Sequence, residues 1–376
     1  LKDHFILNQF GYDASAFYTT FLRLSNPAAA AVSIAPGSQY IGDTSTKTQS
    51  AAAFGQANFH ISDKLTATGG LRYTYDKREG ISDTSTVGTP YAATSLPFHY
   101  NVDVKGGNWS YLASLSYKLT DHSLAYVTYS TGYKSAGLNL NSAVTAGSPL
   151  VLQPEKVDNR EIGLKQSLLN NRATLNLSAF WTDLTGLQAN IVPSNGARSF
   201  LANVGDVRAK GVEAEATWEI VRGLDASLNG SYNDVRYTSY PNAPCGVGVT
   251  GVCDLTGAEV YQAPKWVWNA ALSYAWDLSG DIQPYVLGQY SYRSAVFGTV
   301  DDSPYGRIPS YALANARLGA KFGRGRYDAS IWVNNLTDKT YFQNLSTASI
   351  VAAAAFGFAG QLGAPRTWGA TLRAQF

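Results

Sequence analysis

The sequence predicts an all-β protein, an antiparallel transmembrane β-barrel with about 13–14 strands present. Apolar and polar residues alternate along segment after segment, and each segment is about ten residues long, as a tilted bilayer-spanning strand requires. Short and long connections then alternate between these segments. A soluble β-sandwich explains the alternation, but its strands are shorter and its loops are not sorted by length.

The composition agrees with this fold class. Charged residues make up 15% of the 376 residues, against about 25% in a typical soluble domain, and aromatic residues reach 12%. No stretch holds 18 consecutive apolar residues, so no transmembrane helix is predicted. The net charge of +2 provides no basic surface for nucleic acid. The sequence has no Met, even at position 1, so we expect it to lack an upstream part.

The chain divides into two regions. Residues 1–46 are predicted to form a partial strand near 1–12 and an extracellular loop, because "LKDHFILNQF" alternates poorly. Residues 47–376 carry the regular strands. Trp and Tyr gather at the ends of the apolar faces, as interfacial aromatic girdles require. The clearest strands are, in chain order, "LTATGGLRYTY" (65–75), "NWSYLASLSYKL" (108–119), "RATLNLSAFW" (172–181), "WVWNAALSYAW" (266–276), "YALANARLGAKF" (311–322) and "TWGATLRAQF" (367–376).

The connections between strands fall into two sets. Short turns at one rim and long loops at the other are typical of an outer-membrane barrel. The short turns are expected at 119–123, 168–172, 221–224, 277–281 and 322–326. The long loops are expected at 77–107, 134–155, 239–264, 294–310 and 343–364.

The two cysteines lie in one long loop, "CGVGVTGVC" (245–253). Its G-x-G-x-x-G spacing does not predict dinucleotide binding, since no strand precedes it and no helix follows. A cell surface is oxidising, so we predict a Cys245–Cys253 disulfide. Metal ligation by the pair is the alternative, although no His lies nearby.

The sequence offers no enzyme motif. Its four histidines (His4, His60, His99 and His122) are scattered without metal-ligand spacing, and no G-x-S-x-G is present. We therefore expect no enzyme activity, no catalytic residue, no metal site and no cofactor, although rim residues of a barrel enzyme need not be close in sequence. In "GVEAEATWE" (211–219), Glu213, Glu215 and Glu219 share one face, and we interpret them as lumen-facing groups rather than an acid–base pair.

Several segments, in their order and spacing, resemble the C-terminal barrel region of TonB-dependent outer-membrane receptors. They are "SAAAFGQANFHISDKLTATGGLRYTYDKR" (50–78), "LAYVTYSTGYKSAGLN" (124–139), "LQPEKVDNREIGLKQSLLNNRATLNLSAFWTDLTGLQ" (152–188), "NVGDVRAKGVEAEATWEIVRGLDASLNGSYNDVRYT" (203–238), "APKWVWNAALSYAW" (263–276) and "WVNNLTDKTYF" (332–342).

The resemblance implies a barrel of about 22 strands closed by an N-terminal plug, in the outer membrane of a Gram-negative bacterium. The plug and the first strands are missing from this sequence. The implied function is TonB-dependent, energy-coupled uptake of a scarce nutrient, most often a ferric siderophore. The implied partners are outer-membrane lipid, TonB with its inner-membrane energising complex, an extracellular small-molecule ligand and the barrel-assembly machinery.

Two sets of residues are candidates for function. Aromatic and basic side chains of the outer loops suit an anionic iron chelate: Tyr133, Lys134, Arg198, Arg293, Tyr305 and Arg307. The resemblance also implies that the last strand, with Trp368, Leu372 and the terminal Phe376, is an outer-membrane assembly signal.

Two other functions stay open on the sequence alone. A self-contained 14-strand channel or porin for small solutes would need residues 1–12 to pair with 367–376. A surface-exposed structural or adhesive barrel would be expected to have repeat-rich loops, and none is seen in the sequence.

Overall fold

The computed structural model describes residues 2–10, 39–87, 98–140, 149–191, 200–246, 249, 251–278, 281–347 and 358–375. In these ranges nearly all regular structure is β-strand, and the one helical element is the short 3₁₀ turn η3, Pro304–Gly306. No helix of the described residues is long and apolar enough to cross a membrane.

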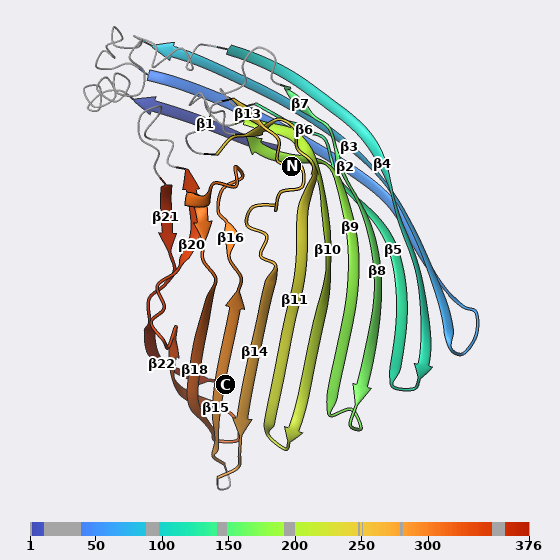
Figure 1. Cartoon of the computed structure of the whole chain (residues 1–376), viewed down its shortest axis with the longest axis vertical. Coiled ribbons are helices and arrows are strands. Elements are labelled where there is room, and N and C mark those ends of the chain that lie inside the picture. The colour runs from blue at the N-terminus through green and yellow to red at the C-terminus, as the bar shows by residue number, and fades with distance from the viewer. Residues whose placement is uncertain are drawn as a thin grey trace.

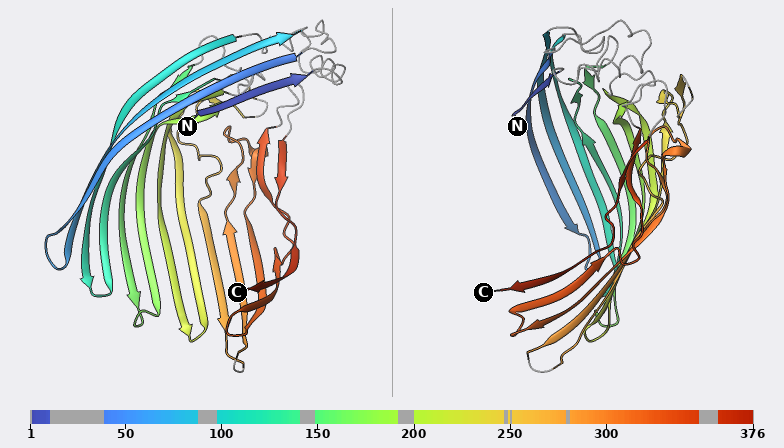
Figure 2. Two further views of the ribbon diagram at one scale, coloured as in Figure 1. Left: turned by 180° about the vertical axis from the view of Figure 1, so that it is seen from behind. Right: turned by 90° about the vertical axis from the view of Figure 1, so that its left-hand side faces the viewer.

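Fourteen strands form one curved, fully antiparallel sheet, with the short turns at the bottom and the longer connections at the top (Figures 1 and 2). This confirms the predicted fold class. In order across the sheet, the strands are β1 (Lys2–Phe10), β2 (Gln39–His60), β3 (Leu65–Val87), β4 (Phe98–Thr120), β5 (Ser123–Lys134), β8 (Glu155–Leu168), β9 (Ala173–Ile191), β10 (Phe200–Val221), β11 (Leu224–Ser239), β14 (Trp266–Ala275), β15 (Gln283–Arg293), β18 (Tyr311–Phe322), β19 (Tyr327–Asn334) and β22 (Thr367–Ala374).

The pairing register carries one apolar face across the whole sheet. Directly paired residues lie on the same face, so the row Leu164, Leu177, Ala214, Gly230 and Trp268 crosses five strands on the outer side. Of this row, Leu177, Ala214 and Trp268 are on the apolar faces that the alternation of their segments predicts. Because lipid surrounds a barrel on its outer side, large apolar side chains can remain outside the protein core there.

The opposite face carries the polar residues. Glu213 pairs with Ser178 on one side and Ser231 on the other, and Glu215 pairs with Asn176 and Asn229. The predicted lumen-facing position of these glutamates is therefore confirmed.

Aromatic rings cover glycines on the lumen face. The ring of Tyr126 lies over its cross-strand partner Gly163, and that of Trp332 lies over Gly369. A Cβ atom on either glycine would lie within 2.5 Å of the ring. These glycines are therefore required by close approach, and they explain part of the high glycine content.

The expectation of strands about ten residues long was wrong for part of the sheet. Strands β3 and β4 each have 23 residues, and most of the predicted long loop at 77–107 belongs to them. About ten residues cross a bilayer, so these strands continue well beyond it on the extracellular side. Polar alternation outside the membrane resembles loop sequence, which explains why the extension was missed. Strand β2 also runs without a break through the predicted region boundary at residue 46.

The extended parts of β2, β3 and β4 form a canopy that arches over the top of the sheet (Figure 1). Strand β4 leaves β5 above the pair Leu112–Ser130 and from there pairs with β3 alone. The inner side of β3 then packs on the top of the barrel wall: Gly80 lies against Leu138 and Leu140, and the Ser82 hydroxyl donates to the Leu140 carbonyl at 3.0 Å.

The remaining long connections contain small hairpins. They are β6–β7 (Gly137–Leu138 and Val151–Leu152), β12–β13 (Ala243–Pro244 and Val252–Cys253), β16–β17 (Val296–Phe297 and Arg307–Ile308) and β20–β21 (Phe342–Thr347 and Phe358–Leu362). Most fully buried side chains are at this end, including Leu152, Tyr237, Tyr240 and Ile308, each 1% exposed. The extracellular end therefore has its own small cores above the membrane-spanning wall.

The two edge strands do not meet within the described residues. β1 pairs with β2 and β22 pairs with β19, and neither has a second neighbour in the sheet. A self-contained channel requires 1–12 to pair with 367–376, and the described parts of these segments, 2–10 and 367–375, do not pair with each other.

Candidate functional site at the extracellular mouth

The fork between β4 and β5 opens a cleft of about 560 Å³ at the base of the canopy. By register, Arg78 lies on the inner face of β3, whereas Lys105 and Lys156 lie on the outer face of β4 and β8. The floor and sides come from the canopy, from the end of β5 and from the β7–β8 and β9 connections. Four charged residues line it: Asp76, Arg78, Lys105 and Lys156. Tyr133, one of the predicted ligand contacts, lies among them.

The cleft has an excess of positive charge. The Tyr133 hydroxyl donates to Asp76, which occupies the one carboxylate of the lining. Arg78 donates from Nη2 to the Ser135 hydroxyl at 2.7 Å, while its buried Nε has no hydrogen-bond partner. Lys105 and Lys156 form no ion pair with any described residue. Three cations around one already hydrogen-bonded carboxylate favour an anionic ligand.

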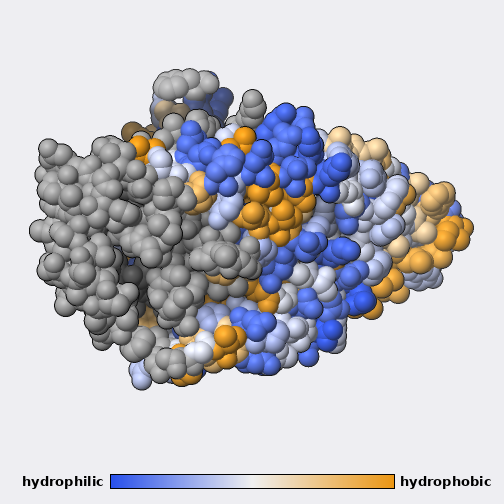
Figure 3. Space-filling model, turned by 90° about the horizontal axis from the view of Figure 1, so that it is seen from above, coloured by the Kyte–Doolittle hydropathy of each residue, from blue (hydrophilic) through white to orange (hydrophobic). Residues whose placement is uncertain are grey.

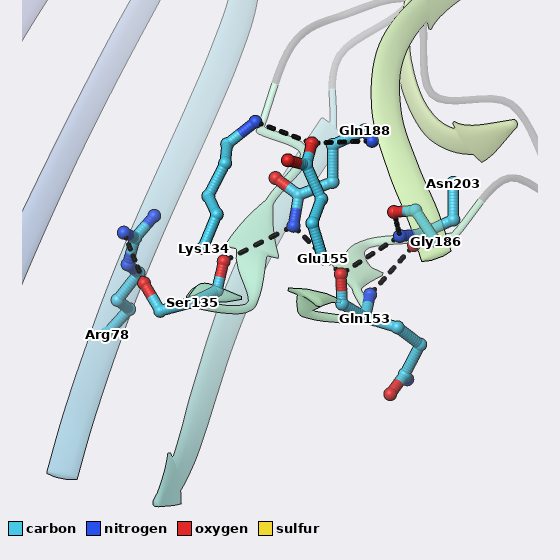
Figure 4. A network of polar contacts seen from close by, with 8 residues as sticks. All are labelled: Arg78, Lys134, Ser135, Gln153, Glu155, Gly186, Gln188 and Asn203. Carbon is cyan, nitrogen blue, oxygen red and sulfur yellow. Dashed lines mark hydrogen bonds and ion pairs between the residues drawn. The ribbon is translucent and has the colours of Figure 1, made fainter. Parts of the chain in front are cut away.

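A polar network beside the cleft fixes the rim (Figure 4). Glu155, only 8% exposed, accepts from Lys134 Nζ at 2.9 Å and from the Gln188 backbone N–H at 2.7 Å. The Gln188 side chain donates to the Ser135 and Gln153 carbonyls. Lys134, a predicted ligand contact, is therefore held by Glu155, with its ammonium group at the surface.

Asn203 completes this network. Its side chain accepts from the Gln153 N–H at 2.8 Å and donates to the carbonyls of Gln153 and Gly186. Gly186 has φ +72° and follows the register irregularity between β9 and β10, so the left-handed backbone turns this carbonyl towards Asn203. The network thereby ties the end of β5 and the β7–β8 segment to β9 and β10 at the mouth.

The other predicted ligand contacts lie at the opposite end of the sheet. Arg293 is at the top of β15, with its guanidinium carbon 5.0 Å from the centre of the Tyr311 ring. Its Nε and Nη2 atoms are buried without a hydrogen-bond partner. Tyr305 is 71% exposed in η3, and Arg307 lies over the Phe297 ring. Arg198 lies outside the described residues.

The structure pairs Cys245 with Cys253, as predicted. The disulfide closes the β12–β13 hairpin, where Tyr237 and Tyr240 pack with their ring centres 5.0 Å apart. Burial raises the pKa of Tyr240 to about 12. In the neighbouring connection, burial and then the Glu259 and Asp301 carboxylates raise the pKa of Asp302 to about 6.

Sequence reasoning missed Arg78, Lys105, Lys156 and Glu155. The first two lie in a segment interpreted as loop, and Lys156 and Glu155 fall where the predicted loop 134–155 meets the next strand. The alternation of "YTYDKREGI" and "YNVDVKGGNW" continues through polar residues and could have indicated the extended strands. In the described ranges, no group of three or more His, Cys, Asp or Glu side chains could hold a metal ion.

Seen from above, hydrophilic side chains cover much of the described surface at this end of the molecule (Figure 3).

The chain matches the family model described as "TonB dependent receptor-like, beta-barrel" over residues 3–336. The chain belongs to the TonB-dependent receptor β-barrel family. It is an outer-membrane barrel segment of a Gram-negative bacterium, in a family of receptors and transporters that bind extracellular ligands and work with TonB.

Its relatives are about twice as long as the chain or longer. The pesticin receptor of Yersinia pestis is 26% identical over 324 residues, which are 81% of this chain and 42% of the relative. A probable TonB-dependent siderophore receptor, PiuA of Acinetobacter baumannii, is 26% identical over 76% of this chain and 36% of its own length. The chain therefore spans less than half of these relatives.

Solved structures confirm the fold. The ferric yersiniabactin uptake receptor FyuA of Yersinia pestis superposes with a TM-score of 0.71 at 22% identity, covering 90% of this chain and 47% of that one. The copper transporter OprC gives 0.64 at 12% identity, with 90% and 55% covered. Receptors with different cargo thus share this wall, so the fold alone does not identify the ligand.

Proposed function

We propose that this chain forms the C-terminal part of the barrel of a TonB-dependent receptor that imports a ferric siderophore. The cationic cleft at the base of the canopy is the observation that carries the proposal, since it offers Arg78, Lys105 and Lys156 to an anionic iron chelate. The relatives named as siderophore receptors support this substrate class.

Binding and energy use are divided between the two sides of the membrane. The ligand is captured at the extracellular cleft, with Arg293, Tyr305 and Arg307 as further contacts from the β15–β18 connection. TonB and its inner-membrane complex act from the periplasm, through a part of the receptor outside this chain. The wall is a continuous hydrogen-bonded sheet, so we expect it to stay fixed during transport. The element that moves is expected to be the plug inside the barrel.

Uptake by the full-length receptor tests the proposal. The receptor is expressed in cells that lack other siderophore receptors, and entry of ⁵⁵Fe is followed with a catecholate, a hydroxamate and a yersiniabactin-type chelate. We expect TonB-dependent entry of at least one chelate, with an Arg78→Gln/Lys105→Gln/Lys156→Gln variant at least tenfold weaker in binding. Lys64→Gln/Lys118→Gln, at the periplasmic turn end, is the control. Uptake that persists without TonB would refute energy-coupled import. Unchanged binding and uptake in the cleft variant would refute the cleft as the binding site.

We also propose that β22 is an assembly signal read by the barrel-assembly machinery. Trp368 and Leu372 lie on its outer face and are 82% and 74% exposed, while Phe376 lies outside the described residues. An exposed apolar edge strand presents both backbone groups and side chains for recognition.

A further inference from the structure

The outer face of the sheet contains an apolar groove of about 880 Å³ between β8 and β14. Its floor is formed by small residues of three neighbouring strands, Ala179, Ala214 and Gly230. Ala214 pairs with Gly230, and Ala179 lies one step higher on the same face, opposite Val212. Larger residues rise on both sides, with Ile162 and Leu177 on one side and Tyr232, Trp266 and Trp268 on the other. This side of the wall faces lipid, so the groove lies at the depth of acyl chains.

Ionic residues begin one step above the groove on the same strands and the same face. The row Ile162–Ala179–Val212–Tyr232 is followed by Arg160–Trp181–Lys210–Asp234, and then by Asp158–Asp183–Arg208–Arg236. Successive residues of one face are separated by about 7 Å along a strand. The change from apolar to charged therefore occurs within one such step, as at the boundary between acyl chains and headgroups.

Four cations of these rows share two carboxylates. Asp183 contacts Arg160 at 3.1 Å and Arg208 at 2.6 Å, and Asp234 contacts Arg236 at 2.8 Å and Lys210 at 3.8 Å. Asp158 lies at the edge and accepts a hydrogen bond from Tyr129. The four basic side chains are 42–57% exposed. Arg236 also donates to the Gly257 carbonyl at 3.0 Å and lies 3.9 Å from Glu259, so the donors for another anion come chiefly from Arg208 and Lys210.

The cations are also held in place before any ligand arrives. Arg208 and Lys210 lie 4.8 and 5.7 Å from the centre of the Trp181 ring. Together with Asp234, Arg236 and Thr238 they line a hollow of about 440 Å³. A guanidinium group in a fixed position suits a phosphate, which it can bind through two parallel hydrogen bonds.

From this order of groups we infer that the outer face of β8–β14 is a binding site for a phosphate-bearing lipid of the outer leaflet. The phosphate occupies the hollow at Arg208, Lys210 and Arg236, and the acyl chains lie in the groove below Tyr232 and Trp266. A soluble anion would use the hollow alone, whereas the register places the groove directly beneath it. The site is on the outer face of the wall and shares no residue with the cleft proposed for the siderophore, although Lys156 of that cleft follows Asp158 on the same face of β8. Its test does not depend on the siderophore proposal.

Native mass spectrometry of the full-length receptor in uncharged detergent tests the inference. The probes are lipid A, its fully dephosphorylated form and inorganic phosphate. We expect one lipid A to stay bound to the wild type, with at least tenfold weaker retention of the dephosphorylated form. Arg208→Gln/Lys210→Gln should weaken lipid A retention at least tenfold, and Ala179→Phe/Ala214→Phe, which fills the groove, should also weaken it.

Lys47→Gln/Lys77→Gln is the matched control, because these two lysines share Glu79 on the same outer face and do not line the apolar groove. It should retain lipid A like the wild type. Folding of each variant is checked by heat-modifiable migration, and Arg208→Lys, which keeps the charge, should retain lipid A better than Arg208→Gln. Equal retention by Arg208→Gln/Lys210→Gln, or of the dephosphorylated lipid, would overturn the inference. If inorganic phosphate binds and the Ala179→Phe/Ala214→Phe variant binds it equally well, the hollow is a simple anion site and not a lipid site.

Discussion

At the scale of single residues, Glu155 determines the shape of the extracellular rim. It is the shared acceptor of Lys134 and the Gln188 N–H, and it is nearly buried. Glu155→Ala removes this acceptor and leaves the buried N–H unsatisfied, at a cost of about 1–3 kcal/mol. We expect faster amide exchange in residues 134–155 and 186–190, measured by hydrogen–deuterium exchange. Glu155→Gln keeps an acceptor and should be milder, and equal exchange in all three proteins would contradict this role.

Asp302 makes the β15–β18 connection sensitive to pH. Its folded pKa, about 6, is above its usual value of 3.8, because burial and neighbouring carboxylates favour the protonated form. The stability contributed by the protonated form is fully present below pH 3.8 and is lost as the pH rises through about 6.

Amide exchange of residues 296–308 should therefore be slower at pH 5 than at pH 7.5, after correction for the intrinsic rates. Asp302→Asn should remove this difference and slow exchange at pH 7.5. Asn tolerates the φ of +50° at this position, so the backbone is not strained by the change. A pH difference that persists in the variant would mean that another group titrates.

Residue types in the loops indicated ligand contacts without locating them. Tyr133 and Lys134 were predicted, and the structure places them at the cleft and its supporting network. Arg78 could not be predicted, because its position depends on segments 57 residues apart coming together at the canopy. Glu155 could not be predicted either, because its partners Lys134 and Gln188 are 21 and 33 residues away in the sequence. Alternation predicts which face a residue occupies, but not which distant element covers it.

At the scale of elements, the register predicts opposite outcomes for neighbouring residues of β9. Leu177 is on the lipid face and Asn176 on the lumen face, where it donates to Glu215 at 3.3 Å. Leu177→Arg should lower the free energy of unfolding by about 2–4 kcal/mol and reduce the folded receptor in the outer membrane. Asn176→Arg places a cation beside Glu215 and should be tolerated. Equal loss in both variants, measured by heat-modifiable migration, would contradict the assigned faces.

The last strand provides a second test at this scale. Deletion of Phe376 should reduce the amount of receptor assembled in the outer membrane, because the terminal aromatic residue of the proposed assembly signal is lost. Fractionation of outer membranes with quantitative immunoblotting measures the amount. Phe376→Tyr keeps an aromatic ring and should assemble better than the deletion. A deletion variant present at the wild-type level would refute the proposal.

The period of two in the sequence was sufficient to assign faces for every clear strand, since lipid and water impose it on each spanning segment. The lengths of the strands were predicted less well from the sequence. Beyond the bilayer both faces of a strand meet water or polar protein surface, so the pattern that distinguishes strand from loop weakens there. That is why 65–75 was identified as a strand but its continuation to Val87 was not.

At the scale of the whole molecule, the relatives indicate a larger receptor. The chain has a mass of 40.4 kDa, and the pesticin receptor match spans 42% of that protein. We expect the native receptor that carries this C-terminus to have about twice the mass or more, by intact mass spectrometry after detergent extraction. A folded, heat-modifiable protein near 40 kDa would instead support the small channel and contradict energy-coupled import.

The canopy is the part of the receptor that macromolecules from the medium contact first. The upper halves of β3 and β4 extend outwards beyond the bilayer, and arch over the mouth of the barrel (Figure 2). An antibody, a phage or a protein toxin arriving from the medium would touch this hairpin before it could touch the cleft beneath. The canopy is thus the surface on which an attacking macromolecule can select for change, while the cleft, as the proposed binding site, is constrained by the shape of its ligand.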